Sequence, residues 1–97
     1  MVQDIRRTAE FSRWLDALAD PSARGRILVH IRRLSLGNPG DVRSVGAGIS
    51  EIRIDWGPGY RIYLTRREGA VAILLCGGDK RTQRNDIALA KQLAEHL

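Results

Sequence analysis

Two segments of alternating apolar and polar residues, joined through Gly57-Pro58-Gly59, constrain the fold of this chain most strongly. In Ser50 to Trp56 and Tyr60 to Thr65, every second residue is apolar or aromatic, as in a strand with one face on a core. The glycines and proline supply the reversal. The sequence therefore predicts an antiparallel hairpin. Its core face would carry Ile52, Ile54, Trp56, Tyr60, Ile62 and Leu64, and its exposed face Glu51, Arg53, Asp55, Arg61, Tyr63 and Thr65.

The residues before this hairpin predict a short strand and two helices. The strand spans Val2 to Arg7, and Thr8 follows it as the cap of a first helix. Asp20-Pro21 is a start signal for a second helix, which Gly37-Asn38-Pro39-Gly40 ends. A short joint predicts that the helices pack as a hairpin. Helical spacing predicts one apolar stripe on each helix. The stripe of the first helix is Phe11, Trp14, Leu15 and Leu18, and that of the second is Ala23, Ile27, Ile31 and Leu34.

The residues after the hairpin predict a central strand and a last helix. A second reversal at Glu68-Gly69 leads into Ala70 to Cys76, whose continuous apolar run is typical of a strand covered on both faces. Gly77-Gly78 would end this strand, and Thr82 would cap the helix, with Asp86 near its positive end. The apolar face of that helix would be Ile87, Ala90, Leu93, Ala94 and Leu97.

These elements together predict the α+β class. An N-terminal strand and a helical hairpin would pack on an antiparallel sheet of three to four strands, with a closing C-terminal helix. The length of 97 residues predicts a single domain over 1–97, with both tryptophans in its core.

Composition excludes several classes of function. One cysteine, Cys76, excludes a disulfide framework and is expected to be an inert buried thiol. His30 and His96 show no ligand spacing, so we expect no metal and no small-molecule cofactor. The longest apolar run is far shorter than the ~20 residues that cross a membrane, so a cytoplasmic protein without membrane contact is expected.

The charge of the chain points to an anionic partner. Of 16 basic residues against 11 acidic ones, 14 are arginine, whose planar fork binds phosphate or carboxylate through paired hydrogen bonds. On the second helix, arginines project toward water or a partner, and the residues that we assign to nucleic-acid binding there are Arg24, Arg32 and Arg33.

Arg53 and Arg61 share the exposed face of the hairpin, but their register is open. A tight loop over Trp56 to Pro58 sets them opposite each other, which is unfavourable unless an anion lies between them. A wider loop over Gly57 to Gly59 pairs Arg61 with Asp55 and Arg53 with Tyr63. The first register favours a phosphate site, and the second a solvated ladder of side chains.

A second basic cluster, Gly77-Gly78-Asp79-Lys80-Arg81, follows the central strand where the chain turns toward the last helix. Glycines permit close backbone approach, and a helix start offers unpaired amide donors. This exit should lie near the arginine face. Any catalysis would clamp a phosphate and stabilise the charge that develops on it, with Lys80 or a tyrosine as proton carrier. Tyr63 is a candidate for stacking on a base.

The chain resembles the RelE/ParE superfamily of bacterial toxins, specifically its HigB-like addiction module killer branch. The motifs that carry the resemblance are Leu36-Gly37-Asn38-Pro39-Gly40-Asp41, Val45-Gly46, Glu51-Ile52-Arg53-Ile54, Gly57-Pro58-Gly59-Tyr60-Arg61-Ile62-Tyr63 and Leu74-Leu75-Cys76-Gly77-Gly78-Asp79-Lys80. The resemblance implies the fold described above and the toxin role of a type II toxin–antitoxin system. Its implied activity is ribosome-dependent, metal-independent cleavage of messenger RNA.

The resemblance also implies catalytic residues and partners. Arg61 matches a phosphate-holding arginine, Arg53 a basic position on the preceding strand, and Lys80 with Arg81 the basic pair after the last strand. The implied partners are a cognate helix-turn-helix antitoxin, the ribosome and messenger RNA. Two alternatives stay open at this point: a ParE-like poison of DNA gyrase that cleaves no RNA, and a non-toxic basic module that binds RNA or protein.

Overall fold

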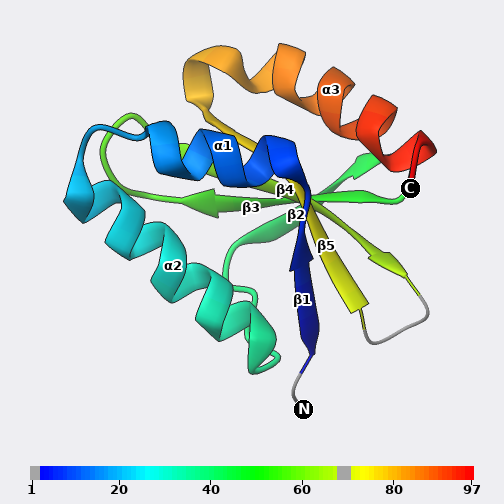
Figure 1. Ribbon diagram of the computed structural model, residues 1–97, viewed down its shortest axis with the longest axis horizontal. Helices are drawn as coiled ribbons and strands as arrows, with labels where there is room; N and C mark the ends of the chain where they lie inside the picture. The colour runs from blue at the N-terminus through cyan, green and yellow to red at the C-terminus, as the bar shows by residue number, and fades with distance from the viewer. Residues whose placement is uncertain (1–2, 68–70) are drawn as a thin grey trace.

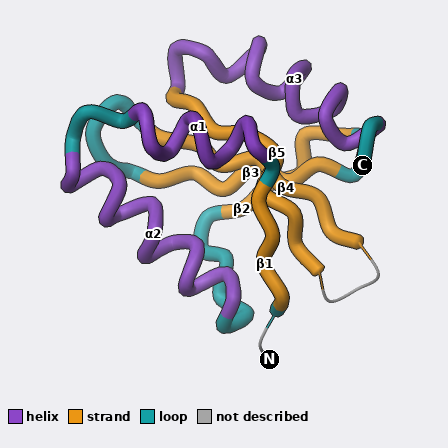
Figure 2. Tube along the Cα trace, in the orientation of Figure 1, coloured by secondary structure: helices purple, strands orange, loops and turns teal. Residues whose placement is uncertain are grey.

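The computed structural model describes residues 3–67 and 71–97 (Figures 1 and 2). The elements are, in chain order, β1 (Asp4–Arg7), α1 (Ala9–Ala17), α2 (Pro21–Ser35), β2 (Val42–Gly46), β3 (Ile49–Ile54), β4 (Tyr60–Arg67), β5 (Val71–Asp79), the 3₁₀ turn η1 (Lys80–Thr82) and α3 (Gln83–Glu95).

The strands of the described residues form one five-stranded sheet in the order β1-β5-β4-β3-β2. Neighbouring strands from β2 to β5 are antiparallel, whereas β1 lies parallel to β5. The predicted α+β class is confirmed, including the antiparallel sheet and the closing helix.

Both N-terminal helices begin where the sequence predicts. The Thr8 hydroxyl accepts a hydrogen bond from the Phe11 amide at 3.0 Å, and the Asp20 carboxylate accepts one from the Ser22 amide at 2.9 Å. These side chains satisfy amides that the first turn of a helix leaves without partners. Pro21 follows at the first position of α2, where a missing N–H costs nothing.

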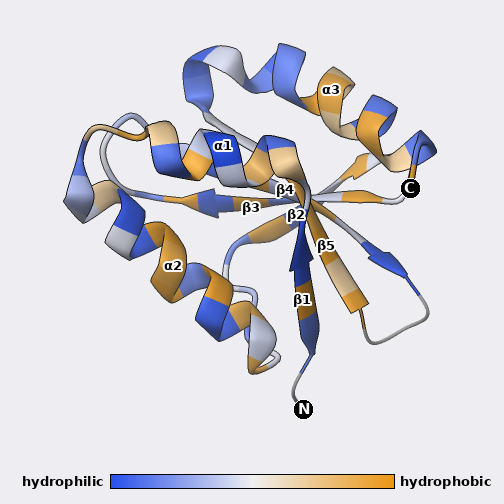
Figure 3. Cartoon of the chain, in the orientation of Figure 1, coloured by the Kyte–Doolittle hydropathy of each residue, from blue (hydrophilic) through white to orange (hydrophobic). Residues whose placement is uncertain are grey.

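The sheet separates hydrophobic clusters on its two faces. Helices α1 and α2 cover the face that carries Ile52, Ile54, Ile62, Leu64, Ala72 and Leu74, and they contribute Phe11, Leu15, Ile27 and Leu34. Helix α3 contributes Ala90 to the cluster on the other face, with Ile49, Tyr63, Leu75 and Cys76. Figure 1 shows α3 apart from the α1–α2 pair, and in Figure 3 much of β5, which serves both clusters, has the hydrophobic colour.

The cover by α3 corrects one expectation. The face with Arg61, Tyr63 and Thr65 was expected to be exposed, but all of these residues are buried, and so is Glu51. The alternation predicted for each strand is confirmed. The prediction that this face is exposed to solvent was wrong, because the apolar stripe of α3 packs against it.

Gly77 and Gly78 do not end the central strand, because β5 continues to Asp79. A Cβ atom added at Gly77 would overlap the Trp14 ring, and one added at Gly78 would overlap the Asp86 carboxylate. The glycines therefore permit close packing inside the strand, which is another use of this residue besides turning the chain.

The start of the last helix also differs from the expectation. Asp79 caps η1 by accepting from the Arg81 amide, whereas Thr82 makes no side-chain cap for α3. The Thr82 hydroxyl instead donates to the Asp86 carboxylate. Helix α3 ends at Glu95, so Leu97 lies beyond it and is exposed rather than part of its apolar face.

Other differences concern the margins of the fold. Strand β2 was not predicted, because its residues are mostly exposed and show no apolar alternation. Trp14 and Trp56 are partly buried at the edge of the core instead of inside it. The predicted reversal at Glu68-Gly69 and the first residue of the predicted strand Val2–Arg7 lie outside the described residues.

Candidate anion-binding site

The hairpin of β3 and β4 adopts the register in which the two arginines face each other. Arg53 lies opposite Arg61, and Ile54 lies opposite Tyr60, so the connecting loop spans residues 55–59. On its other side, Arg61 pairs with Gly78 of β5. Lys80 begins η1 directly after β5. The ends of β3, β4 and β5 therefore bring basic side chains from distant sequence positions to one corner of the sheet.

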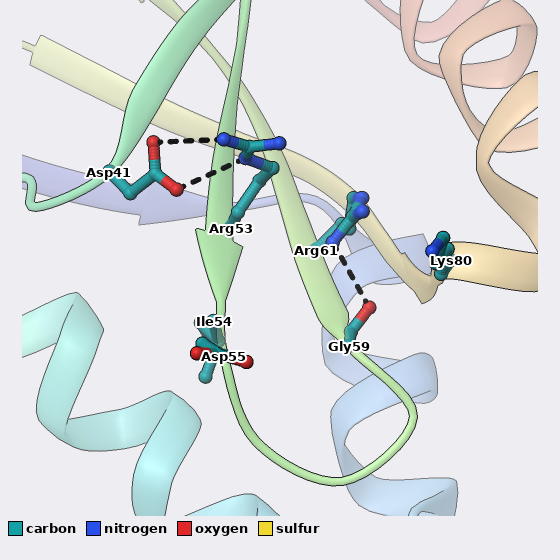
Figure 4. Close-up of a pocket in the computed structure, with 7 residues that line it drawn as sticks. All are labelled: Asp41, Arg53, Ile54, Asp55, Gly59, Arg61 and Lys80. Atoms are coloured by element: carbon teal, nitrogen blue, oxygen red, sulfur yellow. Dashed lines mark hydrogen bonds and ion pairs between the residues drawn. The ribbon is translucent and has the colours of Figure 1, made fainter.

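A cavity of about 350 Å³ lies at this corner (Figure 4). Its basic lining residues come from β3, β4 and η1, and its acidic lining residues come from the positions just before β2 and just after β3. The described residues that line it are Asp41, Arg53, Ile54, Asp55, Gly59, Arg61 and Lys80. The cavity is large enough for a phosphate group and part of a nucleotide, and cations and carboxylates face it together.

Arg53 is held by Asp41, which precedes β2. Its Nε lies 3.1 Å from one carboxylate oxygen, and its Nη2 lies 3.5 Å from the other. The Arg53 amide also donates to the Asp41 carbonyl at 2.9 Å. The Arg53 side chain is 39% exposed, so this ion pair is in contact with solvent and contributes little stability. An anion that enters the cavity can therefore compete with Asp41 at small cost.

Arg61 is held differently, because its side chain is only 10% exposed. Its Nη1 donates to the Gly59 carbonyl at 3.3 Å, and its Nε lies 3.8 Å from the carboxylate of the buried Glu51. Each facing arginine thus has its own carboxylate, Asp41 for Arg53 and Glu51 for Arg61. This arrangement offsets the repulsion expected of two like charges across a strand pair.

The side chains of Lys80 and Arg81 have different surroundings although the two residues are adjacent in the sequence. Lys80 lines the cavity, and within residues 3–67 and 71–97 it forms no ion pair. Arg81 is not among the lining residues, and its Nη2 pairs with Asp79 at 3.1 Å. The hydrogen bond from Arg81 holds the pKa of the Asp79 carboxyl below its ordinary value. The structure therefore places three of the predicted catalytic cations in the described cavity lining and Arg81 outside it.

Tyr63 does not reach the cavity, which corrects its predicted exposure. Its ring is fully buried under α3, and its hydroxyl donates to Glu51 at 3.0 Å. Burial, and then the bond to Glu51, raise the pKa of Tyr63 well above its ordinary value of 10.0. In this conformation Tyr63 can neither stack on a base nor transfer a proton to a ligand in the cavity.

The arginines of α2 lie on an element that does not line the cavity. The Arg24 Nη1 donates to the Leu18 carbonyl at 2.6 Å, so part of its fork is used within the fold. Arg32 and Arg33 are exposed in the last turn of α2, where positive charge complements the helix dipole. A surface for nucleic acid on α2 would thus be separate from the cavity.

A model of the Gp49-like family of phage-derived proteins matches residues 13–95 of the chain. The chain belongs to this family. An uncharacterized protein of Haemophilus influenzae is 50% identical over 97 residues, which cover 100% of the Gp49-like chain and 98% of that relative.

Solved structures share the fold of the Gp49-like chain. A mutant of the Escherichia coli toxin RelE in the free state superposes with a TM-score of 0.74 at 10% identity, covering 95% of this chain and 98% of RelE. The toxin–antitoxin complex RelBE2 of Mycobacterium tuberculosis contains a chain that matches with a TM-score of 0.52 at 19% identity, covering 82% of this chain and 100% of that one. These matches confirm the RelE-like fold that the resemblance implies.

The Gp49-like chain has polar residues at this corner that the sequence reasoning did not single out. Asp41 was counted as part of a motif, and Asp55 and Glu51 as members of a strand face. Asp41 lies twelve positions before Arg53 and reaches it only through the pairing of β2 with β3. No local pattern predicts such a contact, because it depends on the register of the sheet.

The described residues contain no group of three or more His, Cys, Asp or Glu side chains that could hold a metal ion. Across the same residues, no helix is both long enough and apolar enough to span a membrane.

Proposed function

We propose that this chain is the toxin of a type II toxin–antitoxin pair and that it cleaves messenger RNA on the ribosome. The observation that carries the proposal is the cavity at the strand ends, where Arg53, Arg61 and Lys80 converge. Fold relatives support the biological setting, since one is a toxin and another is part of a toxin–antitoxin complex.

In this proposal the cations clamp the phosphate at which the RNA chain is cut. Arg61 is the fixed donor, because its side chain is buried and held from two sides. Arg53 leaves Asp41 to meet the phosphate, and the exposed Lys80 adds a point charge from η1. Negative charge that develops on phosphorus-bound oxygens is stabilised by donors already in place.

The reaction would use the RNA's own 2′-hydroxyl. Its oxygen bonds to phosphorus, and the bond from phosphorus to the 5′-oxygen breaks, which leaves a 2′,3′-cyclic phosphate and a 5′-hydroxyl. The Asp55 carboxylate, which lines the cavity, accepts the proton of the 2′-hydroxyl, and Lys80 donates one to the 5′-oxygen. Arg81 lies next to Lys80 and would contact the flanking nucleotides.

The proposed partners follow from this role. A helix-turn-helix antitoxin would neutralise the toxin, and the ribosome would present the messenger RNA, both in the cytoplasm. Arg24, Arg32 and Arg33 on α2 would bind RNA outside the cavity.

Induction in bacterial cells tests the function. We expect the wild type to stop growth and to cut transcripts, and Lys80→Gln to lose most of both effects. Lys80 is exposed, so this change should leave the fold intact. Arg84→Gln is the matched control, because Arg84 is an exposed cation on α3 outside the described lining of the cavity. Intact transcripts after induction of the wild type would refute RNA cleavage.

The same experiment separates the alternatives. DNA breaks and filamentation with intact messenger RNA would favour a gyrase poison. Normal growth together with salt-sensitive RNA binding would favour a non-toxic binding module.

A further inference from the structure

Directly behind Arg61 lies a buried polar cluster that the proposed clamp does not use. Its centre is Glu51, whose side chain is fully buried between the sheet and α3. One of its oxygens, Oε2, accepts from the Tyr63 hydroxyl at 3.0 Å and from the Gln83 side-chain amide at 2.9 Å. The Arg61 Nε lies 3.8 Å from the same oxygen. Donors from β4 and α3 thus surround one carboxylate oxygen of β3.

This cluster is costly for the fold. The other carboxylate oxygen, Oε1, and the Arg61 Nε are both buried without a hydrogen-bond partner in the described part of the chain. Buried polar atoms without partners reduce stability, and apolar residues of similar volume often replace a buried ion pair without loss. Stability alone therefore gives no reason for a carboxylate at position 51.

The geometry of Arg61 supplies a reason. Arg61 faces Arg53 directly across the strand pair, so repulsion pushes the two guanidinium groups apart. Glu51 attracts Arg61 from behind, on its Nε side, while Gly59 accepts from Nη1. The remaining donors of the guanidinium are left for the cavity that Arg61 lines.

We propose that Glu51 is a positioning residue that holds the Arg61 guanidinium in place for the phosphate, with Tyr63 and Gln83 fixing the carboxylate in turn. The role in cleavage rests on the proposed function, whereas the effect on Arg61 does not. Glu51 contacts no substrate in this arrangement, since it is fully buried. Its contribution is to restrict Arg61 to one orientation before the anion arrives.

Glu51→Gln is the informative variant. Glutamine has nearly the same shape and keeps one acceptor oxygen for Tyr63 and Gln83, but it loses the charge that attracts Arg61. Glu95→Gln is the matched control, because it makes the same substitution at an exposed position at the end of α3. Thermal unfolding of both variants verifies that they are folded.

Two readouts follow Arg61 and the reaction separately. In the NMR spectrum of the free protein, we expect the Arg61 Nε–H signal to exchange with water several-fold faster in Glu51→Gln than in the wild type. In RNA cleavage, we expect kcat to fall about 10- to 100-fold, as for a misplaced reacting group, with KM unchanged. Binding of a 2′-deoxy oligonucleotide, which cannot be cut, should be as tight as in the wild type or tighter. Glu95→Gln should match the wild type throughout.

The outcomes are distinguishable. An unchanged Arg61 Nε–H signal in a folded Glu51→Gln variant overturns the proposal, whatever the activity. A weakened affinity for the 2′-deoxy oligonucleotide with normal kcat overturns it as well, because Glu51 would then serve binding. If the wild type cuts no RNA and the Arg61 signal still changes, the proposed function fails while the positioning of Arg61 by Glu51 stands.

Discussion

At the scale of single residues, Gly77 and Gly78 allow close packing next to the site because they have no side chain. Trp14 and Asp86 occupy the space that side chains at these two positions would need. Gly78 also pairs with Arg61 across the β4–β5 ladder. The place of the dipeptide before Lys80 could be predicted to be functionally important. Its packing partners could not be predicted from the neighbouring sequence, because they come from α1 and α3.

Gly77→Ala tests this packing. The added methyl group would overlap the Trp14 ring, so we expect the free energy of unfolding to fall by about 1–3 kcal/mol. Gly25→Ala is the opposite case, because Gly25 lies in α2 with nothing near its missing side chain. That change should raise stability by about 0.5–1 kcal/mol. Urea denaturation of both variants measures the difference, and equal effects would contradict the close contact.

The buried thiol of Cys76 should lower the free energy of unfolding at alkaline pH. Burial raises the pKa of its thiol to about 12 from the ordinary 9.0. Above pH 9 the unfolded chain releases this proton while the folded chain keeps it, so the free energy of unfolding falls as pH rises from 9 toward 12. Tyr63 adds a similar loss above its ordinary pKa of 10.0.

Cys76→Ala should therefore flatten the part of the stability curve that begins near pH 9 and leave the part due to Tyr63. Urea denaturation across a pH series checks this. A wild-type curve that stays level through pH 12 would mean that the thiol is not buried as described.

At the scale of elements, Thr8 joins β1, α1 and β5. Its hydroxyl accepts from the Phe11 amide at 3.0 Å and donates to the Leu75 carbonyl at 2.6 Å. The cap was predictable, since a threonine before an apolar helical stripe is a local signal. The bond to β5 was not, because β1 and β5 are far apart in the sequence and their parallel pairing depends on the completed sheet.

Thr8→Val removes both hydrogen bonds and keeps the shape of the side chain. We expect a loss of about 1–3 kcal/mol, because the cap and the bond to Leu75 disappear together. Thr8→Ser keeps the hydroxyl and should lose less than half as much. Thermal denaturation of the pair measures this, and similar losses in both variants would assign the effect to the methyl group instead.

At the scale of the whole molecule, the net charge of +5 favours association with an anionic polymer, and under the proposed function the cavity would determine where its phosphates bind. Each phosphate of single-stranded RNA that the protein neutralises should contribute about −0.7 to the slope of the logarithm of affinity against the logarithm of salt concentration.

Lys80→Gln should reduce the magnitude of that slope by up to about 0.7, because the cavity loses one of its phosphate-binding cations. Arg13→Gln is a control of equal charge change, since Arg13 is exposed on α1 and paired with Glu10. Fluorescence titrations with a short RNA at several salt concentrations give both slopes. An equal reduction by the two variants would place binding in the overall charge of the protein rather than in the cavity.

Much of this fold could be predicted from the sequence, because it depends on interactions between neighbouring residues. The caps at Thr8 and Asp20, the apolar stripes of α1 and α2 and the alternation of β3 and β4 depend on neighbours within a few positions, so the amino-acid order specifies them. Arg53 and Arg61 could be assigned to one strand face for the same reason. The burial and the ion-pair partners of the site residues depend on long-range packing. Helix α3 covers Tyr63 and Glu51, and the register of the sheet brings Asp41 next to Arg53. A side chain's face follows from its own strand, but its exposure and ion-pair partner depend on segments that only the folded chain brings near.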